Sequence, residues 1–411
     1  APGPGSEARW PMLGLLAAAV LLAMSPWFAA AAAGPELRRL WGLGDSGTAW
    51  LTSMVQLGFV AGTLVAAILN LADLWSGRGY FAGAALLAAG ANLALLAVDG
   101  YPAALALRFL TGFALAGVYP PAMKMAATWF REERGLAIGV VVGALTVGKA
   151  LPYLVDWFGG ARLRAVLLAT SAGALVAAGL VLAAYRDGPF RFPGRRFDWH
   201  LAGRVARLRE LRLVTGGYLG HMWELYSYWA WIGAFLAASQ LQHLGGQGTG
   251  PTGHLAFAAI AVGAIGCVWA GRVADRIGRE RVVTWSLVVS GACAAGVGFA
   301  FGESLWILLP IVLVWGVAVI ADSAQFSALV TEVAPADAVG TALTLQTSLG
   351  FLLTLVTIQL VPPVVGLVGW RWAFSILVAG PVFGIACIQR LARVRSEAGS
   401  GLAAEGPVPG P

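Results

Sequence analysis

The chain has 411 residues and a formal net charge of +7, and 59% of its residues are hydrophobic while 11% are charged. A soluble protein of this length could not bury so much apolar surface in one core, so the composition excludes the ordinary soluble class. It also disfavours nucleic-acid binding. The basic residues border apolar segments and are not arranged with base-stacking aromatics along a soluble surface.

Apolar stretches recur along the chain, and each is about long enough to cross a bilayer, since about 20 helical residues span the ~30 Å hydrocarbon core. They lack the alternation of barrel strands and are too long for them, so we predict helices. In the first half the predicted spans are Trp10–Ala33, Ser46–Leu69, Tyr80–Val98, Ala103–Phe130, Gly135–Phe158 and Arg164–Tyr185. In the second half they are Val214–Ala238, Leu255–Ala270, Val282–Phe301, Trp306–Thr331, Ala338–Leu360 and Arg371–Leu391. The expected fold is an all-α polytopic membrane protein with twelve transmembrane helices in two six-helix bundles.

The basic residues are distributed unevenly between the two sets of loops. One set contains the arginine-rich central loop and the segment 271–281. The other set carries few basic residues, namely Arg38, Arg39, Arg162, Arg164 and Arg371. By the positive-inside rule, both termini and the central loop face the cytoplasm. We therefore expect a multi-pass protein of the cytoplasmic (inner) membrane.

Spans and loops divide the chain into four parts: an N-terminal bundle over 1–185, a central loop over 186–212, a C-terminal bundle over 213–392 and a tail over 393–411. Within the central loop, Leu201, Val205 and Leu208 recur at helical spacing, which indicates an interfacial amphipathic helix from Trp199 to Leu211. A solvated linker is the alternative. The Gly-, Pro- and Ser-rich tail is expected to be disordered.

A similar loop follows the second span of each half. The later copy reads Gly271-Arg-Val-Ala-Asp275-Arg276-Ile-Gly278-Arg279, and the earlier one contains Asp73, Gly77 and Arg78. The repeated position indicates that the two halves are related.

With twelve spans, a division into six and six, and these two loops, the chain resembles the major facilitator superfamily. The resemblance covers nearly the whole chain and implies a secondary active transporter that works by alternating access. The earlier loop departs from the family pattern at Leu69 and Leu74. In such a loop, an Asp can accept hydrogen bonds from a neighbouring helix N-terminus or an Arg, and these bonds break when the halves move apart. The alternative is that the arginines only fix the topology.

Several ionisable residues fall inside apolar spans, where each costs several kcal/mol unless it faces a cavity or a partner. The first half contributes the cations Arg108 and Lys149, and the second half contributes the acids Glu224 and Asp322, with His221 one turn before Glu224. The family resemblance places Arg108, Glu224 and Asp322 on helices that line the central cavity. The spaced glycines after Arg108 also resemble those of proton-linked family members.

These charges suggest specific roles. Arg108 and Lys149 could hold an anionic substrate, as a planar fork and a point charge. Glu224 or Asp322 could carry a proton, because burial favours the neutral form of a carboxyl, and His221 could relay it. The alternative is a structural salt bridge between the halves, for example between Arg108 and Asp322. Among the aromatics of the fourth and seventh spans, Tyr119 and Tyr226 are the preferred candidates for the walls of a solute pocket.

Other chemistry has little support in the sequence. The stretch ending Gly148-Lys149 has Ala150 where a phosphate loop needs Ser or Thr, and it lies in an apolar helix. The histidines are dispersed, and neither they nor the cysteines have metal-ligand spacing. We expect no catalytic residue, no cofactor and no metal, and hence no enzyme.

The sequence thus predicts a proton-coupled transporter of a small organic solute, in particular an anion, embedded in the lipid bilayer and functional as a monomer. Proton-driven efflux of drug-like amphiphilic solutes is the alternative. A non-transporting membrane sensor or a membrane-embedded enzyme is less favoured.

Overall fold

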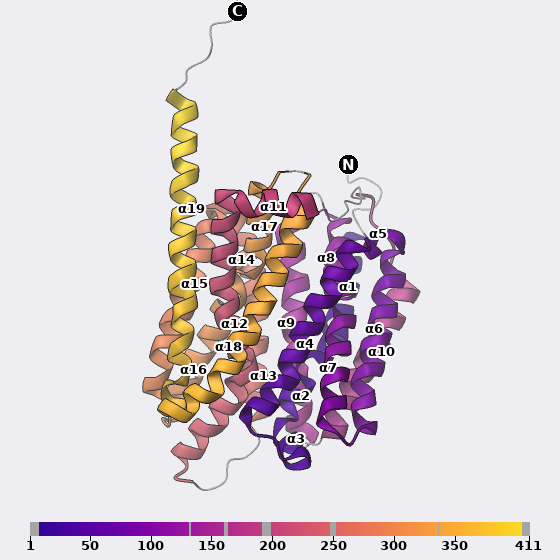
Figure 1. Cartoon of the computed structure of the whole chain (residues 1–411), viewed down its shortest axis with the longest axis vertical. Coiled ribbons are helices and arrows are strands. Elements are labelled where there is room, and N and C mark those ends of the chain that lie inside the picture. Colours follow the sequence, from indigo (N-terminus) through magenta and orange to yellow (C-terminus); the bar gives the residue numbers. More distant parts are fainter. Residues whose placement is uncertain are drawn as a thin grey trace, which may run out of the picture.

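A computed structural model describes residues 8–130, 133–159, 163–190, 199–246, 252–335 and 337–404. Within these ranges, the side chains of residues 72, 73, 156, 159, 199, 200 and 398–404 lie outside the description. The motif residue Asp73 is among them. The described part is almost entirely helical, as the apolar runs predict (Figure 1).

The first half of the chain supplies the helices drawn in indigo to magenta in Figure 1. They are α1 (Arg9–Ala23), η1 (Ser25–Phe28), α2 (Ala29–Ala32), α3 (Gly34–Trp41), α4 (Asp45–Ile68), α5 (Leu71–Leu74), α6 (Gly77–Ala94), η2 (Leu95–Ala97), α7 (Tyr101–Leu115), α8 (Tyr119–Ala127), α9 (Arg134–Gly159) and α10 (Leu163–Ala184).

The second half begins with α11 (Trp199–Arg207). It continues through α12 (Arg209–His243), α13 (Gly253–Ala261), α14 (Gly263–Ile277), α15 (Arg279–Gly296), η3 (Val297–Ala300), α16 (Leu305–Ala321), α17 (Ser323–Val333), α18 (Val339–Ala373), η4 (Phe374–Val378) and α19 (Ala379–Ala404).

Ten helical stretches of the described chain are long and apolar enough to cross a membrane. The last, Val339–Glu397, runs through α18 and most of α19 and turns at Gly369, whose φ of +72° lies in the left-handed region that favours glycine. The 35-residue helix α12 lies outside these ten stretches. The last stretch counts as two helices when it is divided at its turn, and α12 adds one more. The total is consistent with the twelve transmembrane helices that the sequence predicts.

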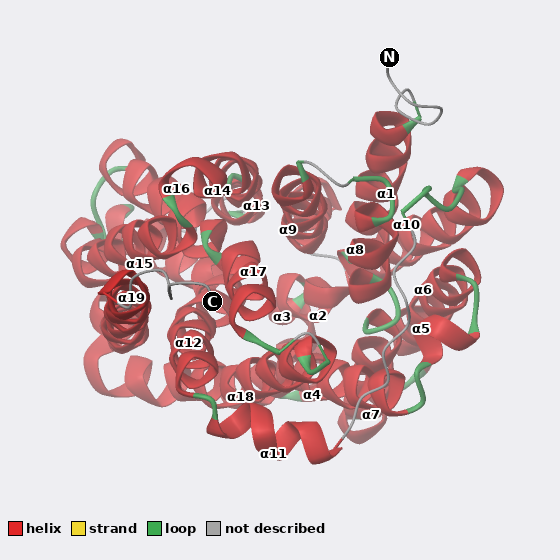
Figure 2. Ribbon diagram, turned by 90° about the horizontal axis from the view of Figure 1, so that it is seen from above, coloured by secondary structure: helices red, strands yellow, loops and turns green. Residues whose placement is uncertain are grey.

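The two halves repeat one packing pattern. Helix α4 packs on α7 as α14 packs on α16, and α6 packs on α10 as α15 packs on α19. Likewise α1 packs on α9 and α10, while α12 packs on α18 and α19. The halves meet where α4 lies along α18 and where α9 lies along α13 and α14 (Figure 2). This internal repeat agrees with the repeated loops in the sequence.

Close packing of α4 on α7 depends on glycine. A Cβ at Gly58 would lie 2.0 Å from the carbonyl oxygen of Phe109, and a Cβ at Gly112 would lie 2.0 Å from that of Val55. Helices α4 and α7 therefore touch backbone to backbone, as small residues permit in lipid.

Four of the spans are interrupted near their middle, among them the eighth, which breaks at Val262 between α13 and α14. Of the other three, the first changes from α1 into the short helix η1 at Ser25, the fourth breaks between α7 and α8, and the tenth breaks at Asp322 between α16 and α17. Interrupted helices leave backbone groups unpaired, which membrane proteins tolerate where other groups satisfy them or where the backbone lines a cavity.

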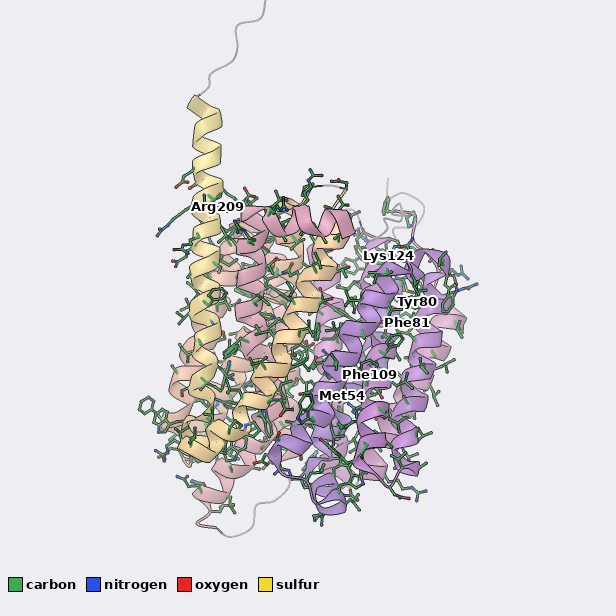
Figure 3. All side chains as sticks on the ribbon, in the orientation of Figure 1. Met54, Tyr80, Phe81, Phe109, Lys124 and Arg209 are labelled. Atoms are coloured by element: carbon green, nitrogen blue, oxygen red, sulfur yellow. The ribbon has the colours of Figure 1, made fainter. Side chains whose placement is uncertain are left out.

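One end of the molecule carries α11, the start of α1 and the end of α19 (Figure 1). Arg209 lies at this end of the molecule, and Lys124 of α8 lies close to the same end (Figure 3). Helix α11 packs against α18 and α12, and its Arg204 forms a 3.2 Å ion pair with Asp337. We call this the terminal end and the other the distal end. Helix α19 continues to Ala404, so residues 393–404 are helical where the composition indicates disorder.

Candidate functional site

Arg108 on α7 is completely buried and holds the interrupted first span in place. Its Nη1 and Nη2 each donate to the carbonyl of Pro26 at 3.0 Å, and Nη2 also donates to the carbonyl of Trp27. Nη1 donates to Asn92 at 3.1 Å, and Nε donates to the carbonyl of Leu51 at 3.4 Å. A guanidinium has five N–H donors, and here all of them have acceptors. In this state Arg108 has no donor left for a solute.

Lys149 on α9 is the other buried cation, with 1% of its surface exposed. Its Nζ donates a hydrogen bond to the hydroxyl of Tyr226 on α12, in the opposite half. The same nitrogen lies 3.7 Å from the ring centroid of Trp27 and 5.3 Å from that of Trp229. No carboxylate of the described chain lies within 4.0 Å of it. Lys149 is thus a buried cation surrounded by aromatic rings, without a counter-ion among the described side chains.

The rings around Lys149 belong to a larger aromatic cluster that joins the halves. Tyr226 contacts Trp27 at 5.9 Å, Trp229 at 5.2 Å and Phe351 at 5.1 Å between ring centroids. Phe59 packs on Phe351 at 4.6 Å. The cluster draws on η1 and α4 of the first half and on α12 and α18 of the second, so it lies at the interface between the two halves.

Glu224 lies two residues before Tyr226 on α12 and therefore points to the opposite side of the helix. It is 1% exposed and accepts hydrogen bonds from Ser290 at 2.8 Å and from the indole of Trp315 at 2.6 Å. Both partners belong to α15 and α16 of the same half. Glu224 is therefore buried inside the C-terminal bundle and hydrogen-bonded there.

Asp322 lies at the break in the tenth span, and its Oδ1 is 2.8 Å from Nδ1 of His221. Both side chains are 1% exposed. Neither carboxylate oxygen has a well-aligned hydrogen bond from the described residues, and Nε2 of His221 has no partner among them. The pair is packed beside the rings of Tyr218 and Phe326. The structural salt bridge considered from sequence, Arg108 with Asp322, is absent from the described contacts, since each residue has other partners.

Two buried amides that the sequence analysis did not single out also lack partners. Gln56 on α4 and Gln346 on α18 are 0% and 3% exposed, and no atom of either amide has a hydrogen-bond partner in the described chain. Gln56 lies one turn before Phe59 of the aromatic cluster. Each glutamine lies inside an apolar span, and an unpaired buried amide costs free energy. That position could have identified both residues as candidates for the functional site.

At the distal end a cavity of about 370 Å³ lies between the halves. Thr48 and Thr52 of α4 and Tyr153 of α9 line it from one half, and Gly233 and Trp231 of α12 line it from the other. The hydroxyl of Tyr153 donates to the carbonyl of Trp229 at 3.1 Å. Tyr153 is one helical turn beyond Lys149, so the cavity ends one turn short of the aromatic cluster.

At the terminal end α9 and α14 are in close contact. A Cβ at Gly139 would lie 2.7 Å from the carbonyl oxygen of Cys267, and one at Gly135 would lie 3.2 Å from Oδ2 of Asp275. Asp275 therefore lies at the N-terminus of α9 in the opposite half, where a helix favours negative charge. The glycines of α9 therefore pack across the interface between the halves.

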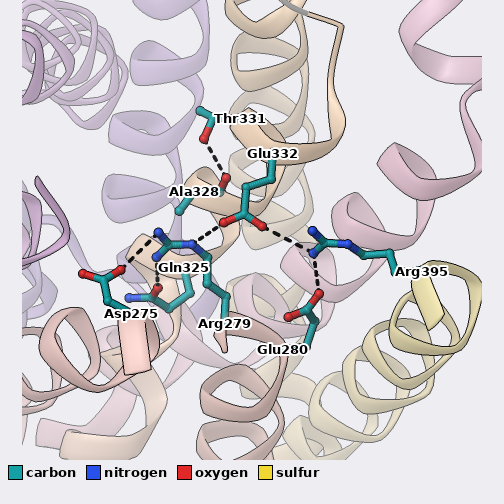
Figure 4. Close-up of polar contacts among 8 residues, drawn as sticks. All are labelled: Asp275, Arg279, Glu280, Gln325, Ala328, Thr331, Glu332 and Arg395. Carbon is teal, nitrogen blue, oxygen red and sulfur yellow. Dashed lines mark hydrogen bonds and ion pairs between the residues drawn. The ribbon is translucent and has the colours of Figure 1, made fainter. Parts of the chain in front are cut away.

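The rest of the second motif loop forms a polar network (Figure 4). Arg279 bonds to Asp275 at 3.3 Å, to Gln325 at 2.8 Å and to Glu332 at 2.7 Å. Arg395 of α19 bonds to Glu332 and to Glu280. Gly278 separates α14 from α15 with φ +94°, a conformation that favours glycine. Helices α14, α15, α17 and α19 are thus linked at this end.

The remaining sequence candidates lie outside these clusters. In the first motif loop, Gly77 begins α6 and a Cβ there would contact Met125 of α8, while Arg78 is exposed. Tyr119 begins α8 directly after the break in the fourth span and packs against the main core. The structure therefore brings Lys149 together with Tyr226 and places His221 beside Asp322, while Arg108 and Glu224 each lie in a separate setting.

Comparison with known proteins agrees with this architecture. A family model of the Major Facilitator Superfamily matches residues 15–358. The crystal structure of a mutant of the nucleoside transporter NupG matches with a TM-score of 0.69 at 14% identity, over 92% of this chain and 99% of that chain. This likeness concerns the fold. None of the curated proteins compared with this chain matches it. Because the family match covers most of its length, the chain belongs to the major facilitator superfamily and is a multi-pass membrane protein and secondary transporter of a small-molecule solute.

Proposed function

We propose that this protein transports a small organic anion across the cytoplasmic membrane by alternating access, coupled to protons. The observation that carries the proposal is Lys149, a buried ammonium group at the interface between the halves without a carboxylate partner in the described chain. A cation in the membrane interior is costly, so its presence there favours a role in binding. An anionic solute would supply the missing counter-charge.

The aromatic cluster supports an organic solute in place of an inorganic ion. Trp27, Tyr226 and Trp229 surround the ammonium group, and Phe59 and Phe351 extend the same surface. Ring faces bind apolar and planar groups by burial and stacking. The amides of Gln56 and Gln346, which have no hydrogen-bond partner among the described residues, are candidates to fix the orientation of such a solute. Arg108 then acts as a positioning residue that holds the turn carrying Trp27.

For proton coupling, the contacts favour Asp322 with His221 over Glu224. Glu224 already accepts a hydrogen bond at each carboxylate oxygen. Asp322 has His221 as its near polar partner among the described residues and lies at a helix break. A carboxylate and imidazole in contact can share or exchange one proton with little rearrangement. We propose that protonation of this pair alternates as the halves move.

The two ends of the molecule fit alternating access. Glycine-mediated contact between α9 and α14 closes the terminal end, and the cavity lies at the distal end. We propose that the terminal end, where the motif arginines lie, faces the cytoplasm, as the positive-inside rule predicts. One chain contains both halves and the whole candidate site, so we propose that the monomer is functional.

The test is uptake and counterflow in proteoliposomes against a panel of carboxylates, amines and neutral solutes, with and without a pH gradient. We expect uptake of an organic anion that responds to the gradient, and loss of that uptake in Lys149→Gln. Arg164→Gln is the matched control, because it removes an exposed cation from the same half. Uptake of the anion by Lys149→Gln at the wild-type rate would overturn the anion site.

The same panel separates the other functions. Export of amphiphilic amines with no anion uptake would support the efflux alternative. Binding of a solute with no flux in either direction would indicate a sensor.

A further inference from the structure

A second hollow lies on the outer surface of the C-terminal half, away from the interface between the halves. It has a volume of about 480 Å³ and is lined by side chains of α14, α15 and α16. Trp269 and Trp285 form its two walls towards the terminal end, and Val317 and Ala321 of α16 lie at its floor. Trp269 is 44% exposed and Trp285 is 53% exposed. The surface faces lipid because the surrounding helices are membrane spans.

Basic residues continue both walls beyond the groove. On α14, Arg272 and Arg276 follow Trp269 by three and seven positions, so they share its face and lie about 5 and 10 Å further along the helix axis. On α15, Arg281 precedes Trp285 by four positions, about 6 Å along the axis. Each wall therefore changes from apolar side chains to tryptophan and then to arginine, in the direction of the terminal end.

These arginines differ from their neighbour Arg279. Arg279 is paired with Asp275 and Glu332. Arg272, Arg276 and Arg281 are exposed, and no carboxylate of the described chain lies within 4.0 Å of them. An apolar groove beside unpaired arginines has the shape and charge of a site for a molecule with an apolar tail and an anionic head.

We propose that this groove binds an anionic phospholipid, with an acyl chain between Trp269 and Trp285 and the phosphate among Arg272, Arg276 and Arg281. Tryptophan favours the depth at which the acyl chain meets the head group, and arginine binds phosphate as a fork of two donors. Clusters of basic residues next to the cytoplasmic end of a span attract anionic lipid in this way. The site is independent of the solute site, since it uses residues of one half alone.

The site also has a mechanical consequence. The arginines lie on α14 and α15 close to Asp275 and Arg279, which contact α9 and the network of Figure 4. A lipid that holds α14 and α15 together at this end fixes the loop in the position seen here, and so favours the state in which the terminal end is closed.

The test is native mass spectrometry of the full chain, released from detergent after titration with phosphatidylglycerol or phosphatidylcholine. We expect phosphatidylglycerol to be retained more strongly than phosphatidylcholine by the wild type. In the variant with Arg272→Gln, Arg276→Gln and Arg281→Gln, its affinity should fall about fivefold per arginine, on the order of 100-fold in total. The control variant, Arg390→Gln with Arg393→Gln, removes exposed arginines from α19 and should retain the lipid.

A second variant tests the acyl-chain site separately. Ala318→Phe fills the groove from its floor and leaves the arginines in place, so it should weaken retention of a long-chain phosphatidylglycerol more than that of a short-chain one. Equal retention of the two head groups by the wild type would overturn the proposal, as would equal losses in the arginine variant and its control. Neither outcome affects the assignment of Lys149 to solute binding.

Discussion

Lys149 of α9 donates a hydrogen bond to Tyr226 of α12, and so joins the two halves of the transporter at the centre of their interface. The bond occupies one of the three donors of the ammonium group. An anion that binds Lys149 must compete with the Tyr226 hydroxyl or share the ammonium with it. If the solute binds at Lys149 as proposed, the contact stabilises the solute-free state and sets part of the cost of binding.

Replacing Tyr226 by Phe tests this competition, because the ring remains while the acceptor is lost. A hydrogen bond contributes about 0.5–1.5 kcal/mol net, so the KM for the transported anion should fall about 2- to 10-fold. The measurement is initial uptake over a range of solute concentrations in proteoliposomes. Tyr153→Phe removes another hydroxyl that joins the halves and is the matched comparison. A rise in KM for Tyr226→Phe would mean that the hydroxyl binds the solute directly.

Arg108→Gln should destabilise the protein whether or not a solute is present. The substitution leaves the carbonyls of Pro26, Trp27 and Leu51 short of a donor in a buried site. Each buried acceptor left without a donor lowers the free energy of unfolding by about 1–3 kcal/mol. We expect a clear fall in the thermal unfolding midpoint in detergent, while Arg164→Gln, an exposed site, should leave it nearly unchanged. An unchanged midpoint with lost anion uptake would instead place Arg108 in the solute site.

Much of the fold could be predicted from the sequence, because crossing a bilayer demands long apolar helices and leaves few alternatives. The apolar runs predict the spans and the two related loops predict the repeated halves. The partners of individual side chains could not be predicted in this way. The sequence identifies Arg108 as a cation inside an apolar span. Its partners depend on the break of the first span at Ser25, because that break leaves backbone carbonyls free to accept from the guanidinium.

The candidate site was foreseeable only in part for the same reason. Lys149 and Tyr226 were identified as an intramembrane charge and a pocket aromatic, but their contact depends on how the halves dock. Trp27 lies at the end of an ordinary apolar run and carries no signal of its own. Glycines four residues apart on α9 favour close helix packing, but their spacing alone does not specify that the packed partner is α14 of the other half.

Asp322→Asn and Glu224→Gln should separate the two candidate proton carriers. We expect Asp322→Asn to abolish the response of uptake to a pH gradient while counterflow at equal pH persists, because the binding site remains but the proton exchange with His221 is lost. Glu224→Gln keeps a hydrogen-bonding side chain toward Ser290 and Trp315, so it should retain the gradient response. The reverse pattern would assign the proton to Glu224.

A larger side chain at Gly139 should force the closed end of the transporter open. A Cβ there would lie 2.7 Å from the backbone oxygen of Cys267 in the opposite half, a separation that backbone cannot relieve without moving the helices apart. We expect Gly139→Leu to lengthen the distance between spin labels at positions 78 and 281, which are exposed at that end in opposite halves. Double electron–electron resonance measures this distance, and Gly90→Leu is the control because nothing lies within 4 Å of a Cβ at Gly90.

Since opening one end and closing the other are coupled in alternating access, Gly139→Leu should also reduce the accessibility of a label at Thr48, which lines the distal cavity. Equal distance distributions in Gly139→Leu and wild type would show that the contact of α9 with α14 does not hold the end closed.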